Sequence, residues 1–159
     1  MEKSGIFSGI DKKIVVSLGF DRFPREMTCD GANNSPEIRI EGLDTPYLAL
    51  ILDDPDAPAG TYTHWILYNV PKTDRTPGNV PVRPNLDKPF SGRQGTNSSG
   101  SAGYDGPCPP RGQIHRYFFR VYGLPDLLES PPGSSRGEIE KEIRSTAKQY
   151  GEAMARYGR

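Results

Sequence analysis

The sequence predicts a mainly β protein, an antiparallel β-sandwich with one peripheral C-terminal helix. Glycine and proline are frequent, with 18 and 16 residues among 159, which indicates many turns joining short segments. The apolar segments between these turns have the length of strands and are bounded by Gly, Pro, Asn or Asp. They are residues 14–18, 38–43, 47–52, 65–70 and 117–124.

Two stretches of the chain have a distinctive composition. Residues 47–52 are apolar without alternation, which predicts a strand covered on both faces, near the centre of the sheets. Residues 71–110 are dominated by Pro, Gly, Ser and Asn, and we expect a long loop of the kind that is usually functional or mobile.

The C-terminal segment has the apolar spacing of a helix. Between residues 138 and 157 the apolar positions recur at intervals of three or four, at Ile139, Ile143, Ala147, Tyr150 and Met154. Ser135 and Glu138 fit a capping box. We therefore expect one amphipathic helix over 138–157, packed on the β core.

Length and charge restrict the classes of function. A chain of 159 residues suits a single domain, here 1–159. Its 20 basic and 20 acidic residues cancel, which argues against nucleic-acid binding. Residues 1–20 are charged and lack a long apolar stretch, so we expect no signal peptide, no integral membrane segment and a cytoplasmic location.

The two cysteines, Cys29 and Cys108, lie far apart in the chain. A protein of this size does not need a disulfide to fold, so we expect free thiols. A disulfide stays open as an alternative, because a sequence gives no Cα separation.

Both histidines of the chain open an aromatic strand. His64 follows a turn rich in Asp and Pro that contains Asp54 and Asp56, and His115 follows a second rigid turn at residues 103–112. If the turns meet, two imidazoles and a carboxylate line a pocket whose glycines let backbone N–H groups approach an anion. The structural alternative is that these are satisfied polar residues at strand ends and ordinary turns.

The two turns taken together resemble the signature segments of the phosphatidylethanolamine-binding family, closest to its bacterial and archaeal Raf-kinase-inhibitor-like branch. The matching segments are residues 54–58, 64–65, 106–112 and 115–117. The resemblance implies a β-sandwich with one anion pocket near the end of the central sheet. It implies these site residues: Asp54 and His64 on one wall, His115 on the other, Pro58, Gly106 and Tyr117 as lining, and Asp56 and Pro109 as support.

We therefore expect a binding protein for a phosphate-like small anion or a phospholipid head group, with no catalytic residues, no cofactor and no metal. Regulation or inhibition of a kinase or a protease is one extension of this hypothesis, and a homodimer is compatible with the branch. The alternative is a metal-dependent or acid/base enzyme that uses Asp54, His64 and His115.

Overall fold

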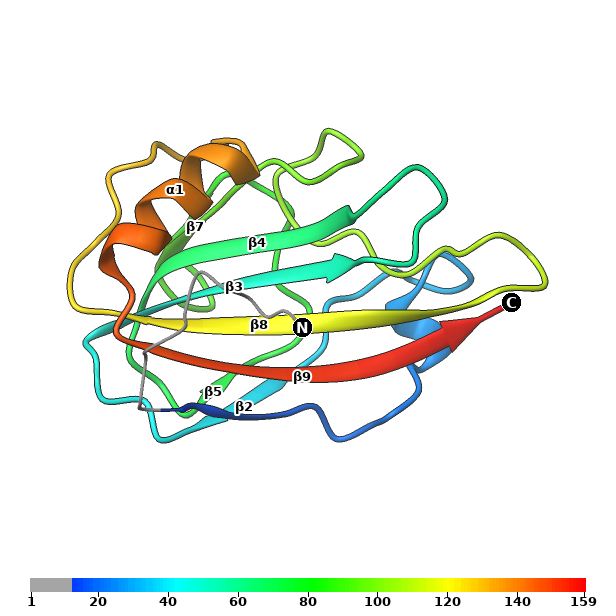
Figure 1. Cartoon of the computed structure of the whole chain (residues 1–159), viewed down its shortest axis with the longest axis horizontal. Helices are drawn as coiled ribbons and strands as arrows, with labels where there is room; N and C mark the ends of the chain where they lie inside the picture. The colour runs from blue at the N-terminus through cyan, green and yellow to red at the C-terminus, as the bar shows by residue number, and fades with distance from the viewer. Residues whose placement is uncertain (1–12) are drawn as a thin grey trace.

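The computed structural model describes residues 13–159 as two packed antiparallel sheets with a helix on the outside (Figure 1). The small sheet has the order β1-β2-β5 and the large sheet the order β6-β7-β4-β3-β8-β9. The strands are β1 (Val15–Ser17), β2 (Ile38–Glu41), β3 (Tyr47–Asp54), β4 (Tyr62–Pro71), β5 (Arg75–Thr76), β6 (Asn85–Leu86), β7 (Gly92–Gln94), β8 (Ile114–Leu124) and β9 (Gln149–Gly158). The helices are the short 3-10 helix η2 (Arg25–Met27) and α1 (Arg136–Thr146).

The strand expected at the centre lies there. β3 pairs with β4 on one side and β8 on the other, and all its residues except Tyr47 are buried. Leu48, Leu50 and Leu52 belong to the core between the two sheets, whereas Ala49 and Ile51 pack on the opposite face. A strand buried on both faces needs no polar alternation, which explains its uninterrupted apolar sequence.

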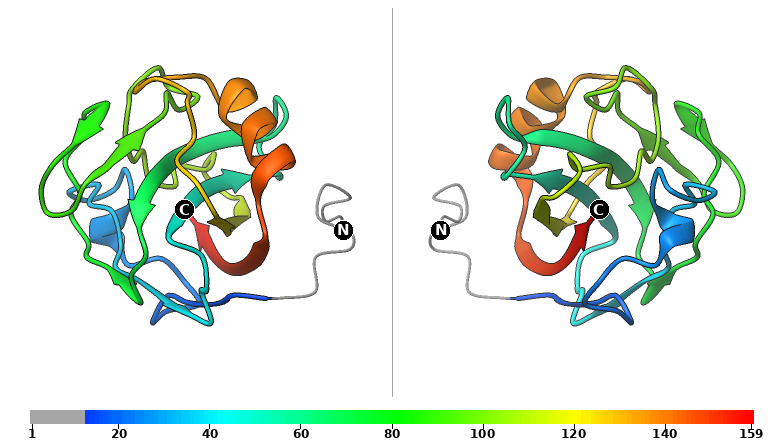
Figure 2. Two further views of the ribbon diagram at one scale, coloured as in Figure 1. Left: turned by 90° about the vertical axis from the view of Figure 1, so that its left-hand side faces the viewer. Right: turned by 90° about the vertical axis from the view of Figure 1, so that its right-hand side faces the viewer.

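The two faces of the large sheet are covered by different elements (Figure 2). The small sheet covers the inner face, where Trp65 and Phe119 meet Ile38 and Ile40. Helix α1 covers part of the outer face through Ile139 and Ile143, which are fully buried. Full burial of a side chain of this size contributes about 1.5–3 kcal/mol, so both layers stabilise the strands that carry the pocket.

The prediction of a helix over residues 138–157 is wrong for the second half of that range. The capping box forms as predicted, with Ser135 as N-cap and Glu138 closing it. However, α1 ends at Thr146, and β9 follows after two residues. β9 pairs with β8 from Gln149 to Gly158, and these tertiary hydrogen bonds override a helical pattern that its Tyr and Met positions also satisfy.

The long loop expected at residues 71–110 contains three short strands, β5, β6 and β7. β7 extends the large sheet by pairing with β4 and β6. Gln94 is fully buried and accepts a 2.6 Å hydrogen bond from Trp65 Nε1, while its amide donates to the carbonyls of Pro81 and Arg83 at 2.8 and 2.9 Å. The segment is thus held to the core by polar contacts that a composition of small residues does not reveal.

The expectation of free thiols is also wrong. Cys29 and Cys108 form a disulfide across a sequence separation of 79 residues, with their Cα atoms 5.4 Å apart. The loop after η2 and the loop before β8 lie side by side, as the 3.2 Å hydrogen bond from Cys29 N to Pro107 O shows. This proximity arises from the tertiary fold and has no local sequence signal.

The charged residues 1–12, on which part of the targeting prediction depends, lie outside the described residues. From residue 13 to the C-terminus, none of the helices is long and apolar enough to cross a membrane.

Candidate functional site

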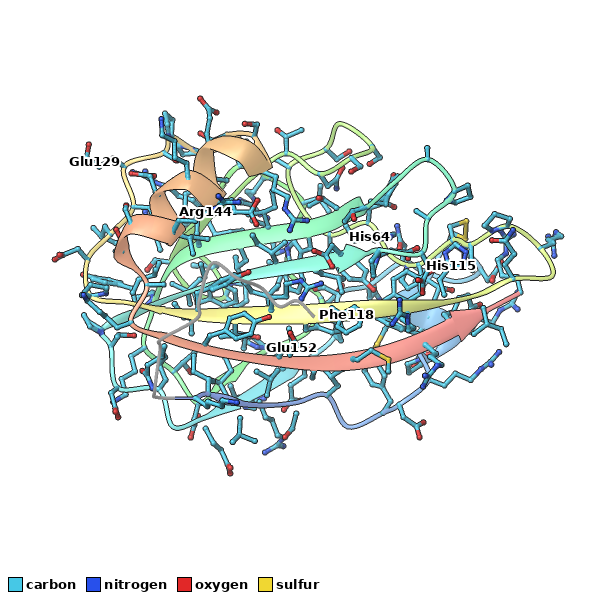
Figure 3. The ribbon with its side chains drawn as sticks, in the orientation of Figure 1. His64, His115, Phe118, Glu129, Arg144 and Glu152 are labelled. Atoms are coloured by element: carbon cyan, nitrogen blue, oxygen red, sulfur yellow. A yellow bond between two sulfur atoms is a disulfide. The ribbon has the colours of Figure 1, made fainter. Side chains whose placement is uncertain are left out.

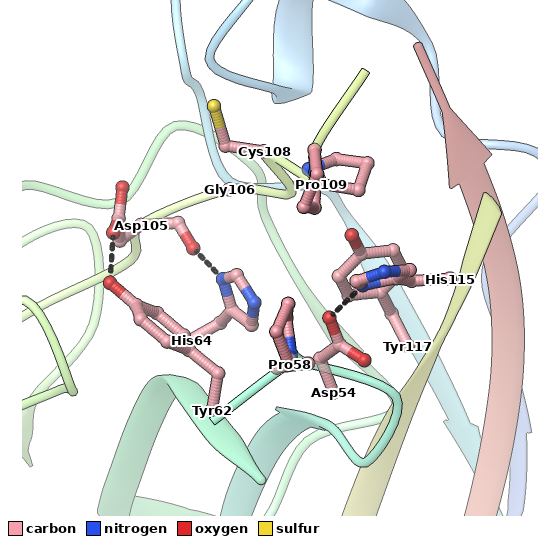
Figure 4. A pocket seen from close by; sticks show the side chains of 12 residues that line it. Asp54, Pro58, Tyr62, His64, Asp105, Gly106, Cys108, Pro109, His115 and Tyr117 are labelled. Carbon is pink, nitrogen blue, oxygen red and sulfur yellow. Dashed lines mark hydrogen bonds and ion pairs between the residues drawn. The ribbon is translucent and has the colours of Figure 1, made fainter. Parts of the chain in front are cut away.

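A pocket of about 270 Å³ lies where the β3–β4 turn meets the loop before β8 (Figure 4). Its lining consists of Asp54, Ala57, Pro58, Tyr62, His64, Asp105, Gly106, Cys108, Pro109, Pro110, His115 and Tyr117. The six predicted lining residues and Pro109 are therefore brought together around one cavity, and Asp56 lies just outside it. His64 and His115 lie near each other and away from Arg144 of α1 (Figure 3).

A buried carboxylate holds His115. Asp54 and His115 are 3% and 4% exposed, and His115 Nδ1 donates to Asp54 Oδ2 at 2.7 Å. The other carboxylate oxygen accepts a 2.8 Å bond from the backbone N–H of Asp56, and His115 Nε2 lies 2.7 Å from Gln113 Oε1. Both ring nitrogens of His115 are thus engaged within the protein.

A β-bulge places His64 on the opposite side of the cavity. β3 and β4 pair Leu52 with Trp65 and Asp53 with Thr63, which leaves His64 as one extra residue on β4. Bulges of this kind redirect a side chain next to a site. Figure 4 shows the ring between the backbone of Asp105 and Pro58.

The tautomer of His64 follows from its partner. Nδ1 lies 2.6 Å from the carbonyl oxygen of Asp105, and a carbonyl only accepts, so Nδ1 carries the hydrogen. Burial lowers the pKa of His64, although the hydrogen bond to Asp105 and nearby carboxylates oppose this effect. A neutral His64 therefore presents the lone pair of Nε2, which accepts a hydrogen bond.

Tyr117 supplies an unpaired donor. Its side chain is fully buried and lines the pocket, and its hydroxyl has no hydrogen-bond partner among the described residues. Burial, and then the negative charge of Asp54, raises the pKa of Tyr117 far above its ordinary value. The hydroxyl consequently stays protonated and able to donate.

Asp56 supports the turn, as predicted. Its carboxylate accepts bonds from the backbone N–H of Arg116 at 2.9 Å and from the Arg116 guanidinium at 2.9 and 2.8 Å. These hydrogen bonds lower the pKa of Asp56 to about 2. The turn between β3 and β4 is thereby fastened to the start of β8.

Gly106 has a different role from the expected backbone donor. Its N–H donates to Asn33 Oδ1 at 2.8 Å and is not free for a ligand. A Cβ at this position would collide with the carbonyl of Met27 and with Asn33 Oδ1. Glycine is required here because the pocket wall packs directly on the loop behind it.

Five of the lining residues were not predicted as site residues, and two of these, Tyr62 and Asp105, add polar groups to the pocket. Tyr62 donates to Asp105 Oδ2 at 3.2 Å, and the Tyr62 ring centroid lies 4.6 Å from that of His64. Asp105 also accepts a 3.4 Å bond from Asn33 Nδ2. Tyr62 precedes His64 by two residues and Asp105 precedes Gly106 directly, so adjacency to the motifs was the available signal.

The metal-site alternative finds no support in the geometry. Across residues 13–159, His, Cys, Asp and Glu side chains form no group of three or more that could hold a metal ion. The pocket instead combines a hydroxyl donor, an imidazole acceptor and a carboxylate-held imidazole, which are hydrogen-bonding groups for a small polar ligand.

Comparisons with known proteins show which proteins the chain is similar to. The chain is 45% identical over 92% of its length to a UPF0098 protein of Pyrococcus horikoshii, covering 76% of that protein. It is 36% identical over 78% of its length to the lipoprotein LppC of Mycobacterium tuberculosis, covering 60% of it.

Solved structures show the same fold. YbcL of E. coli, described as a member of the mammalian PEBP family, superposes with a TM-score of 0.83 at 25% identity, covering 92% of this chain and 99% of that one. A phosphatidylethanolamine-binding protein homologue from Chlamydia trachomatis gives 0.82 at 25% identity, covering 94% and 99%. The profile of the phosphatidylethanolamine-binding protein family matches residues 18–158. The chain belongs to the phosphatidylethanolamine-binding protein family.

Proposed function

We propose that the pocket binds a phosphate-like anion, either free or as the head group of a larger molecule, and that the protein is a binding protein rather than an enzyme. The observation that carries this proposal is the Tyr117 hydroxyl, a buried donor without a partner among the described residues. An unsatisfied buried polar group costs about 1–3 kcal/mol, and a ligand oxygen in the cavity removes this cost.

The other polar groups define the ligand further. His64 Nε2 accepts a hydrogen bond from a protonated phosphate oxygen, or takes up a proton and then donates to an anionic one. A ligand that contacts His115 Nε2 has to replace the amide of Gln113, whose side chain is exposed. The carboxylates of Asp54 and Asp105 disfavour a second negative charge, so a monoanion is the preferred form.

The size and the walls of the pocket suit a phosphoryl group with a short substituent. Its volume of about 270 Å³ lies just below the roughly 300–1,000 Å³ of typical ligand pockets. Pro58, Pro109 and Pro110 give the cavity apolar walls, which favour a few carbon atoms next to the phosphate.

The enzyme alternative rests on the buried Asp54–His115 pair, in which the carboxylate accepts a hydrogen bond from the imidazole. Among the lining residues, however, there is no serine, threonine or lysine, and the one cysteine is in the disulfide. An acid–base pair without a neighbouring nucleophile, in a chain whose residues 13–159 contain no cluster of metal-ligating side chains, supports binding better than covalent or metal-assisted catalysis.

Two wider predictions remain part of this proposal. Regulation of a kinase or a protease would use the same pocket or its surrounding loops to engage the partner. The cytoplasm is the proposed location, where structural disulfides are uncommon and those present are often redox-sensing.

The test is a titration of inorganic phosphate and of phosphoethanolamine, followed by NMR through the ring signals of His64 and His115. Saturable shifts of both rings are expected in the wild type, with loss of binding in His115→Ala. Tyr117→Phe should weaken phosphate binding about 10- to 100-fold, since a hydrogen bond to a charged group contributes about 1.5–3 kcal/mol. The thermal stability of Tyr117→Phe should not fall, because the lost hydroxyl has no hydrogen-bond partner among residues 13–159.

Tyr104→Phe is the matched control. Tyr104 is also buried, but its hydroxyl donates to Met27 O at 2.6 Å, and the residue does not line the pocket. This variant should keep the wild-type affinity and lose about 1 kcal/mol of stability. Unshifted histidine rings at saturating phosphate, or equal affinities of Tyr117→Phe and wild type, would refute the proposal.

A further inference from the structure

The Cys29–Cys108 disulfide fastens one wall of the pocket to the loop behind it. Cys108 stands in the wall between Gly106 and Pro109, all three of which line the cavity, and its sulfur points away from the cavity (Figure 4). Cys29 belongs to the loop after η2, which does not line the cavity. The disulfide is therefore a covalent link between the wall and its support.

The remaining attachments of this wall are hydrogen bonds. Cys29 N donates to Pro107 O at 3.2 Å, and Gly106 N donates to Asn33 Oδ1 at 2.8 Å. The wall also fixes His64, because the carbonyl of Asp105 accepts from its ring. A displacement of this loop would consequently change the groups that face a ligand.

Both cysteines are exposed residues, and the surroundings of their sulfurs differ. The guanidinium of Arg159 donates to Cys108 Sγ at 3.3 Å and to Pro109 O at 3.3 Å. Cys29 is followed by Asp30, whose carboxylate lies 3.3 Å from Arg159 Nε and accepts a hydrogen bond from Tyr157.

These surroundings favour a thiolate on Cys108 over one on Cys29. A neighbouring cation stabilises a thiolate, whereas an adjacent carboxylate opposes it. Thiol–disulfide exchange is fastest when the better-stabilised thiolate leaves. The direction of opening is thus encoded by Arg159 and Asp30.

We propose that Cys29–Cys108 is a thiol–disulfide exchange site that sets the affinity of the anion pocket, with a dithiol reductant as its reaction partner. The regulatory half of this inference rests on the proposed anion binding, and the exchange chemistry stands independently of it.

The reaction is an ordinary two-electron exchange. A thiolate of the dithiol attacks Cys29 Sγ, forms a mixed disulfide and releases Cys108 as a thiolate beside Arg159. The second thiolate of the dithiol then attacks the sulfur that the dithiol contributed to the mixed disulfide. This step closes a disulfide within the reductant and releases Cys29, which takes up a proton. The protein disulfide is reduced to a thiol at Cys29 and a thiolate at Cys108, and the dithiol is oxidised to an intramolecular disulfide, its second proton passing to solvent.

Reduction weakens anion binding for two reasons. The wall loses its covalent attachment and becomes less ordered. Binding of an anion must then order the wall again, and the entropy cost of this ordering lowers the affinity. A thiolate at Cys108 also adds negative charge to the rim. We expect the affinity for phosphate to fall at least about fivefold, at the lower end of typical coupling between sites.

The exchange step is tested on the folded, oxidised protein with the monothiol 2-mercaptoethanol, rapid alkylation of free thiols by a large excess of N-ethylmaleimide, and peptide mapping by mass spectrometry. The mixed disulfide is expected on Cys29 and the alkyl group on Cys108. Arg159→Gln should slow the exchange severalfold. Arg111→Gln is the matched control, because Arg111 is an exposed arginine in the loop that contains Cys108. Arg159, by contrast, is the cation that donates a hydrogen bond to Cys108 Sγ.

A mixed disulfide on Cys108 instead, or equal rates in Arg159→Gln and Arg111→Gln, would overturn the assignment. This experiment does not require the reduced chain to remain folded, nor does it require any ligand.

The regulatory step is tested by phosphate titration of the oxidised protein, of the protein in excess dithiothreitol, and of Cys29→Ser/Cys108→Ser, with circular dichroism to verify folding. Weaker binding in dithiothreitol is expected, with the serine variant between the two states because it lacks the thiolate. Equal phosphate affinity in the oxidised and reduced states would overturn the regulation alone. If the oxidised protein binds no phosphate, the proposed function fails and the regulation fails with it, while the peptide map still decides the exchange chemistry.

Discussion

At the scale of residues, we expect an anion in the pocket to change the protonation of His64. Asp54 and Asp105 contribute two carboxylates to the lining, and His115 is the imidazole held by Asp54. His64 is neutral near pH 7 because burial lowers its pKa. A bound anion makes the imidazolium form of His64 more favourable, so binding and protonation are coupled.

This coupling predicts that the affinity for sulfate rises as the pH falls from about 8 to about 5. Sulfate stays a dianion over this range, so the pH dependence belongs to the protein. Burial lowers the pKa of His64 in the pocket without an anion, and a bound anion raises it. As the pH falls, the affinity for sulfate therefore begins to rise at the pKa of His64 in the complex and becomes constant below the pKa of His64 in the unliganded protein. Calorimetric titration at several pH values measures it.

His64→Gln should abolish most of this pH dependence while leaving the other lining groups, Asp54, Asp105, His115 and Tyr62, in place. Sulfate binding that varies with pH equally in His64→Gln and in wild type would assign the proton to one of those groups instead.

At the scale of elements, the change from helix to strand near Ala147 sets the position of β8. α1 ends with the N–H of Ala147 bonded to Ile143 O at 2.9 Å, and Lys148 N donates to Gly123 O at 2.9 Å. From there β9 follows β8 along its whole length. Because His115 and Tyr117 lie on β8, this pairing supports the pocket from the side opposite β3.

The close approach at Gly151 predicts a large penalty for a side chain there. A Cβ on Gly151 would collide with the backbone carbonyl of Ile14, where the Ile14 N–H donates to Tyr150 O at 2.8 Å. Gly151→Ala should lower the free energy of unfolding by roughly 2–3 kcal/mol, as overpacking does. Chemical denaturation measures this difference.

Gly137 gives the matched comparison. It lies in the first turn of α1, and the nearest atom to an added Cβ is 4.0 Å away. Gly137→Ala should raise the stability by about 0.5–1 kcal/mol through the lower entropy of the unfolded chain. Equal effects of the two substitutions would contradict the role given to the Ile14–Gly151 contact.

At the scale of the whole molecule, contacts far apart in sequence hold the pocket together. The disulfide joins residues separated by 79 positions, the Asp54–His115 pair spans 61 and the Tyr104–Met27 bond spans 77. A site assembled from such distant segments depends on the sandwich being complete.

Loss of the disulfide is therefore predicted to destabilise the whole fold. For a closed loop of this length, the chain-entropy relation gives about 4–5 kcal/mol. Cys29→Ser/Cys108→Ser should lose that amount in urea unfolding, with a steeper dependence on urea because its unfolded chain exposes more surface.

Wild type measured in dithiothreitol is the control and should lose a similar amount. A loss below about 1 kcal/mol in both would show that the disulfide constrains the unfolded chain little.

Much of the site was accessible from the sequence, because its residues lie in two rigid turns next to the aromatic strands. Asp54, Pro58, His64, Gly106, His115 and Tyr117 line one cavity as the resemblance implied. The roles of individual groups were less accessible. The Gly106 N–H is engaged by Asn33, which lies 73 residues away in the sequence. The Tyr117 hydroxyl has no hydrogen-bond partner between residues 13 and 159, which no local pattern reveals.

The residues alone predict the β-sandwich class, the doubly buried strand at residues 47–52, the capping box of α1 and the two turns that carry the site, because each depends on local turn chemistry and side-chain periodicity. Tertiary structure alone decided that residues 149–158 form a strand, that Cys29 and Cys108 are bonded and that His64 lies on a bulge. The hydrogen bonds of a sheet and the distance between two cysteines are properties of segments that meet only in the folded chain, and no local pattern encodes them.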